Sequence, residues 1–230
     1  MSSRRDREIK IRKKMHPFIN IHTHNLRNSL DVISIYNLKQ EESIPNALFS
    51  IGVHPWHINP LNYYAQIKKM ENSISNENAI FIGECGLDKL KCSDFKLQQT
   101  VFQLQINLAI KFQKPMILHC VKAFDEILAM LKNKISPDKI IFHGFHKSPE
   151  MAFDLTAKGY SISVGKSLFI QPDRMKTVFE KVNPNKIFFE TDDSEYSIEE
   201  IYQKAADISG QSLDFWKNQI NSNFEKIIEH

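Results

Sequence analysis

The chain has 230 residues, of which 42% are hydrophobic and 25% are charged, with only seven glycines and nine prolines. This composition is typical of a folded globular protein and excludes a largely disordered or collagen-like chain. The formal net charge of +3 at pH 7 is too small to indicate an acidic or basic partner.

The first sixteen residues differ in character from the rest. They carry seven basic residues against two acids, Asp6 and Glu8. We therefore divide the chain into a basic N-terminal extension, residues 1–16, and one domain, residues 17–230. A charge run has no defined geometry by itself, so we favour a solvated or frayed end over a nucleic-acid contact.

The sequence predicts neither a targeting or membrane-spanning segment nor a disulfide framework. The sequence has no run of about twenty apolar residues, and no apolar stretch follows its basic start, so neither a membrane span nor a secretory signal fits. We therefore expect a cytoplasmic protein. Cys85, Cys92 and Cys120 form no C-x-x-C pair and are expected to be reduced thiols.

Eight short runs rich in Val, Ile and Phe alternate with longer amphipathic segments, which predicts parallel strands joined by helices. Eight strands close an α/β barrel, and 230 residues suffice for one such barrel. In chain order the predicted strands are Phe18–His22, Val32–Asn37, Ala47–Gly52, Ala79–Glu84, Met116–His119, Ile140–His143, Tyr160–Val164 and Ile187–Glu190.

The clearest predicted helix contains Leu97, Val101, Leu104 and Leu108, which form one apolar stripe at helical spacing. The segments His24–Asp31 and Lys39–Asn46 are too short for full helices. The sequence therefore predicts a single (β/α)₈ TIM barrel, slightly trimmed in its first two βα units. The other predicted helices are Leu61–Ile74, Ala123–Lys132, Pro149–Lys158, Pro172–Lys181, Ile198–Ile208 and Leu213–Ile228.

Histidines and acids recur at the carboxyl ends of the predicted strands, the end that forms the active-site face of a barrel. The first strand ends in His22-Thr23-His24, and strand alternation directs both imidazoles to the same side. Six candidate metal ligands converge from five strands: His22, His24, Glu84, His119, His143 and Asp192.

Six nitrogen and oxygen ligands exceed the needs of one tetrahedral ion, so we expect two divalent ions. Zinc, manganese, magnesium and nickel are the candidates. Glu84 lies centrally in strand order and is the expected bridge. A metal pair roughly 3.5 to 4 Å apart lowers the pKa of a bound water and stabilises charge on the attacked group, which predicts hydrolysis.

Each of these residues has a structural explanation when it is taken alone. A His-x-His pair at a strand end is structural about as often as it is functional, a lone buried histidine is usually satisfied by a hydrogen bond, and an acid can cap a helix or form a salt bridge. Carboxylates directed into a barrel mouth nevertheless need a partner to offset desolvation. The convergence of six groups therefore favours a metal site.

The order of these motifs resembles that of the TatD-like metal-dependent hydrolases, many of them described as deoxyribonucleases, among the amidohydrolase-type barrels. The resemblance spans nearly the whole chain after Phe18. It is carried by His22-Thr23-His24, Gly52-Val53-His54-Pro55, the run from Gly83 to Asp88, Leu118-His119, His143-Gly144-Phe145 and Glu190-Thr191-Asp192.

The resemblance implies how the ligands divide between the ions. By this resemblance, one ion is held by His22, His24 and Asp192, the other by His119 and His143, and both share Glu84. Asp192 and Glu84 are then the expected catalytic residues, with Asp192 orienting the attacking water or accepting its proton.

Substrate contacts are less defined by the sequence. His54 is expected to lie behind the ligands or to contact a phosphate, and Lys122 and His146 are further candidates. The chain also departs from the family near the mouth: Asp193–Ser197 runs straight into the next helix, where the family usually has an extended loop, and Val121 stands where the family often has an arginine.

Three functions fit this sequence. The leading hypothesis is a deoxyribonuclease or other phosphodiesterase, acting on single-stranded DNA ends. The alternative is an amide, ester or lactone hydrolase, including aminoacyl-tRNA deacylation, on the same metal site. A non-catalytic nucleic-acid-binding barrel is the third, and the presence of all six ligands argues against it. The sequence does not indicate an oligomeric state.

Overall fold

The computed structural model describes residues 16–26, 29, 31–91 and 94–229. At its centre lies a parallel sheet of eight strands in chain order. All eight predicted strands are present, and β4 continues beyond the predicted end at Glu84. The strands are β1 (Phe18–Thr23), β2 (Val32–Leu38), β3 (Phe49–Ile51), β4 (Ala79–Asp88), β5 (Met116–Val121), β6 (Ile140–Phe142), β7 (Ser161–Val164) and β8 (Ile187–Phe189).

The barrel closes at its mouth, where the ends of the first and last strands meet. Thr23 forms a parallel bridge with Asp192. The His24 amide donates to the Asp192 carbonyl at 3.2 Å, and the Asp192 amide donates to the His22 carbonyl at 3.0 Å. Closure therefore brings together the first and last candidate ligands of the chain.

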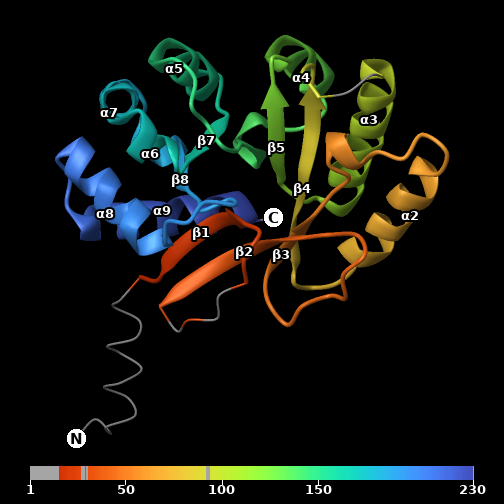
Figure 1. Ribbon diagram of the computed structural model, residues 1–230, viewed down its shortest axis with the longest axis horizontal. Coiled ribbons are helices and arrows are strands. Elements are labelled where there is room, and N and C mark those ends of the chain that lie inside the picture. The colour runs from red at the N-terminus through yellow and green to blue at the C-terminus, as the bar shows by residue number, and fades with distance from the viewer. Residues whose placement is uncertain (1–15, 27–28, 30, 92–93, 230) are drawn as a thin grey trace, which may run out of the picture.

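Helices cover the outside of the strands (Figure 1). They are α2 (Tyr63–Ile74), α3 (Phe95–Phe112), α4 (Phe124–Leu131), α5 (Pro149–Ala157), α6 (Ser167–Ile170), α7 (Pro172–Lys181), α8 (Ile198–Ser209) and α9 (Leu213–Ile228). The described residues form no helix between β1 and β2 or between β2 and β3. The trimming of the first two units is confirmed, and the short helix α6 was not predicted.

Local sequence explains the positions of several helices. In α3, Val101 and Leu108 of the predicted stripe are buried together with Phe102 and Ile106. Helix α8 begins with a capping box, in which Ser197 and Glu200 satisfy each other's backbone amides. It is tied to the barrel by Tyr202, whose buried hydroxyl bonds both the amide and the carbonyl of Ile19 at 3.1 Å.

The predicted N-terminal extension, residues 1–16, lies outside the described residues except for His16. Within the described part of the chain, no helix combines the length and the apolar character that a membrane crossing requires.

Candidate metal centre

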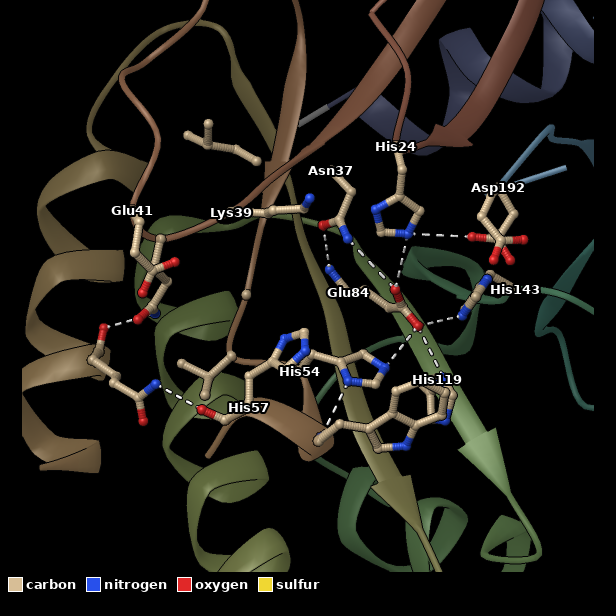
Figure 2. Close-up of a pocket in the computed structure, with 17 residues that line it drawn as sticks. His24, Asn37, Lys39, Glu41, His54, His57, Glu84, His119, His143 and Asp192 are labelled. Atoms are coloured by element: carbon tan, nitrogen blue, oxygen red, sulfur yellow. Dashed lines mark hydrogen bonds and ion pairs between the residues drawn. The ribbon is translucent and has the colours of Figure 1, made fainter. Parts of the chain in front are cut away.

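A cavity of about 610 Å³ opens at the carboxyl ends of the strands, and five of the six candidate ligands line it: His24, Glu84, His119, His143 and Asp192 (Figure 2). The buried Glu84 carboxylate, only 5% exposed, lies at the centre of this group. Its oxygens lie 2.7 to 3.8 Å from imidazole nitrogens of His143, His119, His22 and His24. Four strands thus deliver polar side chains to one point.

Asp192 completes the set of six on the β1 side. Its Oδ1 lies 3.3 Å from His24 Nε2 and 3.5 Å from His22 Nε2. His22 is fully buried, whereas the Asp192 side chain is 36% exposed. Asp192 therefore borders both the buried cluster and the open cavity.

A fifth imidazole, that of His54, reaches the same carboxylate. Its Nε2 lies 3.1 Å from Glu84 Oε1, and its Nδ1 accepts a hydrogen bond from the Trp56 amide at 3.1 Å. The sequence placed His54 behind the ligands or at a phosphate. Its Nε2 is directed at the Glu84 carboxylate, beside His119, so His54 could also serve as a ligand.

Asn37, on β2, holds Glu84 in place and was not identified from the sequence. Its side-chain oxygen accepts from the Glu84 amide at 3.0 Å, and its amide nitrogen lies 3.5 Å from Glu84 Oε2. Strand alternation directs Asn37 into the cavity, which is a signal that the sequence carries.

Two further acids lie behind the histidines. Glu190 Oε1 lies 3.6 Å from His143 Nδ1, and Asp88 Oδ2 lies 3.3 Å from His119 Nε2. Asp88 also accepts from the Trp56 indole at 2.7 Å. Carboxylates in this position fix the orientation of ligating imidazoles. Both acids belong to the sequence motifs, but neither had been assigned a role.

Buried amide side chains of α3 fix the two segments that enter the site. Gln105 accepts from the Val53 amide at 2.8 Å and donates to the Val53 carbonyl at 3.1 Å. Gln98 likewise accepts from the Asp88 amide at 2.7 Å and donates to the Asp88 carbonyl at 2.9 Å. These paired bonds hold the backbone next to His54 and at the end of β4.

The cluster is strongly coupled electrostatically. Burial by itself raises the pKa of Glu84, but the imidazoles of His143, His119 and His22 outweigh burial and hold that pKa well below its usual value. Burial lowers the pKa of His22, whereas Asp192 and Glu84 raise it, with a net result of about 9. The pKa of His143 is raised well above its usual value in the same way, by Glu84 and Glu190 against burial.

The donor set and its unsatisfied atoms fit divalent cations. Both ring nitrogens of His22 and Nδ1 of His143 are buried without a hydrogen-bond partner among the described residues. Such atoms are costly unless a proton partner or a metal satisfies them. In the described part of the chain, three groups of side chains have ligand atoms within 4.8 Å of one another: His22, His24 and Glu84; His22, His143 and Asp192; and His54, Glu84 and His119. Glu84 belongs to two of these groups.

The proposed substrate contacts lie in different places. His54 lines the main cavity, together with Trp56 and His57. His146 is exposed and lines a second cavity, next to Asp192. Lys122 is exposed and is not among the residues that line either cavity.

The fold and this cluster define a class: an α/β barrel whose strand ends carry a histidine–carboxylate centre suited to divalent cations. Within that class, the chain belongs to the family described as TatD related DNase, whose model matches residues 3–229.

Named relatives agree with this membership. The chain is 31% identical over 160 residues to an uncharacterized metal-dependent hydrolase of Buchnera aphidicola, covering 68% of this chain and 60% of the relative. It is 31% identical over 183 residues to a putative deoxyribonuclease TATDN1 homolog of Enterocytozoon bieneusi, covering 73% and 61%. The matched regions thus span about three fifths of the length of these relatives.

Solved structures show the same fold. The Escherichia coli TatD homolog YJJV superimposes with a TM-score of 0.76 at 19% identity, covering 93% of this chain and 98% of that one. A TatD family hydrolase of Entamoeba histolytica gives a TM-score of 0.74 at 16% identity, covering 92% and 98%.

Proposed function

We propose that this protein is a divalent-metal-dependent phosphodiesterase that hydrolyses single-stranded DNA. The observation that carries the proposal is the Glu84 carboxylate, which is 5% exposed and has five imidazoles within 3.8 Å of its oxygens. Such a density of imidazole and carboxylate groups in an enclosed barrel mouth suits a metal pair better than a structural hydrogen-bond network.

The geometry supports a division of the ligands between two ions. His22, His24 and Asp192 would hold one ion, and His119 and His143 would hold the other. Glu84 would be shared, because its Oε2 faces His22 and His24 while its Oε1 faces His119 and His143. When bound, a divalent ion pair lowers the pKa of a coordinated water and neutralises charge on a phosphate.

The protein's own groups account for the rest of the chemistry. Asp192 borders the cavity, and we assign to its carboxylate the orientation of the attacking water and the acceptance of its proton. Glu190 and Asp88 would keep the rings of His143 and His119 in their ligating orientation. His54 would contribute either to the metal ligands or to the phosphate contacts, because its Nε2 faces Glu84 from the wall of the cavity.

Lys39 offers one cationic contact for a phosphodiester in the main cavity. Lys39 lines this cavity with His57, and the acids Glu41, Glu84, Asp192 and Asp193 line it as well. Figure 2 shows the Lys39 side chain extending across the cavity toward Asn37. A cation beside a metal centre attracts the remaining negative charge of a phosphodiester.

The names of relatives support a nucleic-acid substrate but differ on the sugar. The Enterocytozoon bieneusi relative is named a putative deoxyribonuclease. A human relative, 31% identical over 119 residues, covering 50% of this chain and 16% of that one, is named a 3'-5' RNA nuclease. The family description favours DNA, and RNA is therefore a necessary arm of the test.

The test compares five substrates in the presence of Mn²⁺, Mg²⁺ or Zn²⁺: single-stranded DNA, RNA, aminoacylated tRNA, a chromogenic phosphodiester and a chromogenic carboxylic ester. We expect turnover of single-stranded DNA. His119→Ala and Asp192→Asn should each reduce that turnover by more than about a hundredfold, because each variant removes a proposed metal ligand. Asp207→Asn is the matched control, since Asp207 is exposed on α8. Hydrolysis of carboxylic esters without cleavage of any nucleic acid would overturn the nuclease assignment.

A further inference from the structure

Trp56 lies in the wall of the main cavity and is not one of the candidate ligands. It belongs to the single turn η1 (Pro55–His57) and is 45% exposed. Its indole N–H nevertheless donates to the Asp88 carboxylate at 2.7 Å, although the two residues are 32 positions apart in the chain. The exposed ring thus directs its one polar group at a buried acid behind the candidate ligand His119.

The local sequence places Trp56 against two imidazoles. Pro55 starts the turn, and His54 caps it by accepting from the Trp56 amide at 3.1 Å through Nδ1. The Trp56 ring meets the rings of His54 and His119 edge to face, with centroids 4.8 and 5.5 Å away. Both imidazoles face Oε1 of Glu84, at 3.1 and 2.9 Å. Trp56 therefore packs on the side of the site where these two histidines meet Glu84.

Asp88 is held by four polar contacts and is only 1% exposed. Its Oδ1 accepts from the amides of Leu90 and Lys91 at 2.7 and 3.1 Å. Its Oδ2 lies 2.7 Å from the Trp56 indole nitrogen and 3.3 Å from His119 Nε2. The shorter of these two contacts, with the indole, fixes the oxygen that faces the imidazole.

The position of Lys91 argues against Trp56 as a surface for a stacked base. The Lys91 ammonium group lies 3.8 Å from the centroid of the Trp56 ring, which is a cation–π contact. A ring face that is occupied by an ammonium group is not open to a base. The contacts at the edge of the ring therefore favour a positioning role.

The contact with Asp88 bears on which nitrogen of His119 can hold a cation. An ionised carboxylate only accepts hydrogen bonds, so Asp88 requires the proton of a neutral His119 to lie on Nε2. Nδ1 is then left with a lone pair on the side of Glu84. Carboxylates that orient a ligating imidazole in this way strengthen metal binding.

We propose that Trp56 is a positioning residue of the metal centre, which acts through Asp88 to keep Nδ1 of His119 directed at the side of the site shared with Glu84. This inference rests on the proposed function and extends it by one residue, whose side chain is not itself a ligand.

The experiment uses Zn²⁺ and no substrate, so that the loss of a substrate contact cannot imitate the expected result. Competition with a fluorescent chelator measures the Kd for Zn²⁺. NMR of the zinc-loaded, ¹⁵N-labelled protein measures how fast the Nε2 proton of His119 exchanges with water. The variants are Trp56→Phe, which keeps an aromatic ring but loses the N–H, then Asp88→Asn, and the two combined.

Trp216→Phe is the matched control. Trp216, on α9, is the other tryptophan of the chain and also donates through its indole, to Ser209 Oγ at 2.9 Å. It is buried, so this variant should lower the melting temperature while leaving the Kd for Zn²⁺ and the exchange rate unchanged.

Asp88→Asn should raise the Kd by about tenfold, the lower end of the effect expected for a residue that orients a ligating imidazole. Trp56→Phe leaves the carboxylate in place, so we expect a smaller rise of about threefold, with faster exchange of the Nε2 proton. The double variant should bind Zn²⁺ as weakly as Asp88→Asn alone, because an indole that acts through the Asp88 carboxylate has no effect once that carboxylate is gone.

Two results would overturn the positioning role. One is a Kd and an exchange rate in Trp56→Phe equal to those of the unaltered protein. The other is a double variant whose loss equals the product of the two single losses, because Trp56 would then act independently of Asp88. The proposed function fails separately: if Zn²⁺ binding depends on Trp56 as expected but the unaltered protein hydrolyses no phosphodiester, the nuclease assignment is refuted and the positioning role stands.

Discussion

Glu190→Gln should weaken metal binding without unfolding the barrel. Glu190 is 1% exposed, and its Oε1 accepts from the Gly144 amide at 2.6 Å while its Oε2 accepts from the Ser163 hydroxyl at 2.5 Å. A glutamine can keep both bonds, because its oxygen accepts from Gly144 and the Ser163 hydroxyl rotates to accept from its amide. The change therefore removes one negative charge behind His143 and little else.

The size of the effect follows from the distance to the imidazole. Carboxylates that hydrogen bond to a ligating histidine contribute roughly ten- to a hundredfold to metal affinity or activity. Glu190 Oε1 lies 3.6 Å from His143 Nδ1, which is longer than a hydrogen bond. We therefore expect an effect at the lower end of this range: the metal Kd should rise about tenfold, a loss of about 1.4 kcal/mol in binding free energy.

Competition with a fluorescent chelator measures this Kd, and NMR of the His143 ring nitrogens measures its tautomer. Glu195→Gln is the control, because Glu195 is exposed on the loop that precedes α8. A metal Kd equal to that of the unaltered protein, with His143 in an unchanged tautomer, would refute the reasoning.

Three further results are expected. Glu84→Gln should abolish turnover and reduce the metal bound per chain in elemental analysis, because the shared charge is lost; full activity would remove Glu84 from the bridge. Metal present at a hundred times its Kd should stabilise the folded protein by about 2.7 kcal/mol. Removing that metal with a chelator should therefore lower the melting temperature by roughly 5–11 °C, as measured by scanning calorimetry. An unchanged melting temperature would contradict a bound metal. Tyr202→Phe should cost about 1–3 kcal/mol in urea denaturation, because it leaves the buried Ile19 amide without its partner; a smaller loss would mean that water replaces the hydroxyl.

The strands and long helices could be predicted from the sequence, because each must bury one side or face and its apolar residues therefore recur at a regular spacing. Helix α6 was missed since Ser167–Ile170 is a single turn and shows no period. The end of β4 was placed too early because its glycines imitate a strand terminus. These glycines are instead required inside the strand, because β4 and β5 approach closely there. A Cβ at Gly83 would lie 2.4 Å from the carbonyl oxygen of Ile117, and a Cβ at Gly86 would lie 2.0 Å from that of His119.

The six candidate ligands could be proposed from the sequence because histidines and acids are conspicuous at the ends of apolar strands. The residues that position them are less conspicuous: strand alternation places Asn37 on the cavity side but does not indicate which ligand it contacts. Asn37 and Glu84 are 47 residues apart in the chain, and only the folded barrel shows that the two side chains meet. His54 was expected behind the ligands or at a phosphate, and no local pattern in the sequence reveals that its ring lies 3.1 Å from Glu84.

The mouth of the barrel links metal binding to protonation. Burying five imidazoles around one carboxylate is costly unless protons or cations satisfy them. Burial lowers the pKa of His22, but Asp192 and Glu84 favour its protonated form, and the resulting pKa is about 9. A ligating imidazole must be neutral, so each ion that binds displaces such protons. Metal affinity should therefore rise as the pH increases toward 9. Glu84 and Asp192, which stabilise the protonated imidazoles, would then serve as ligands of the ions.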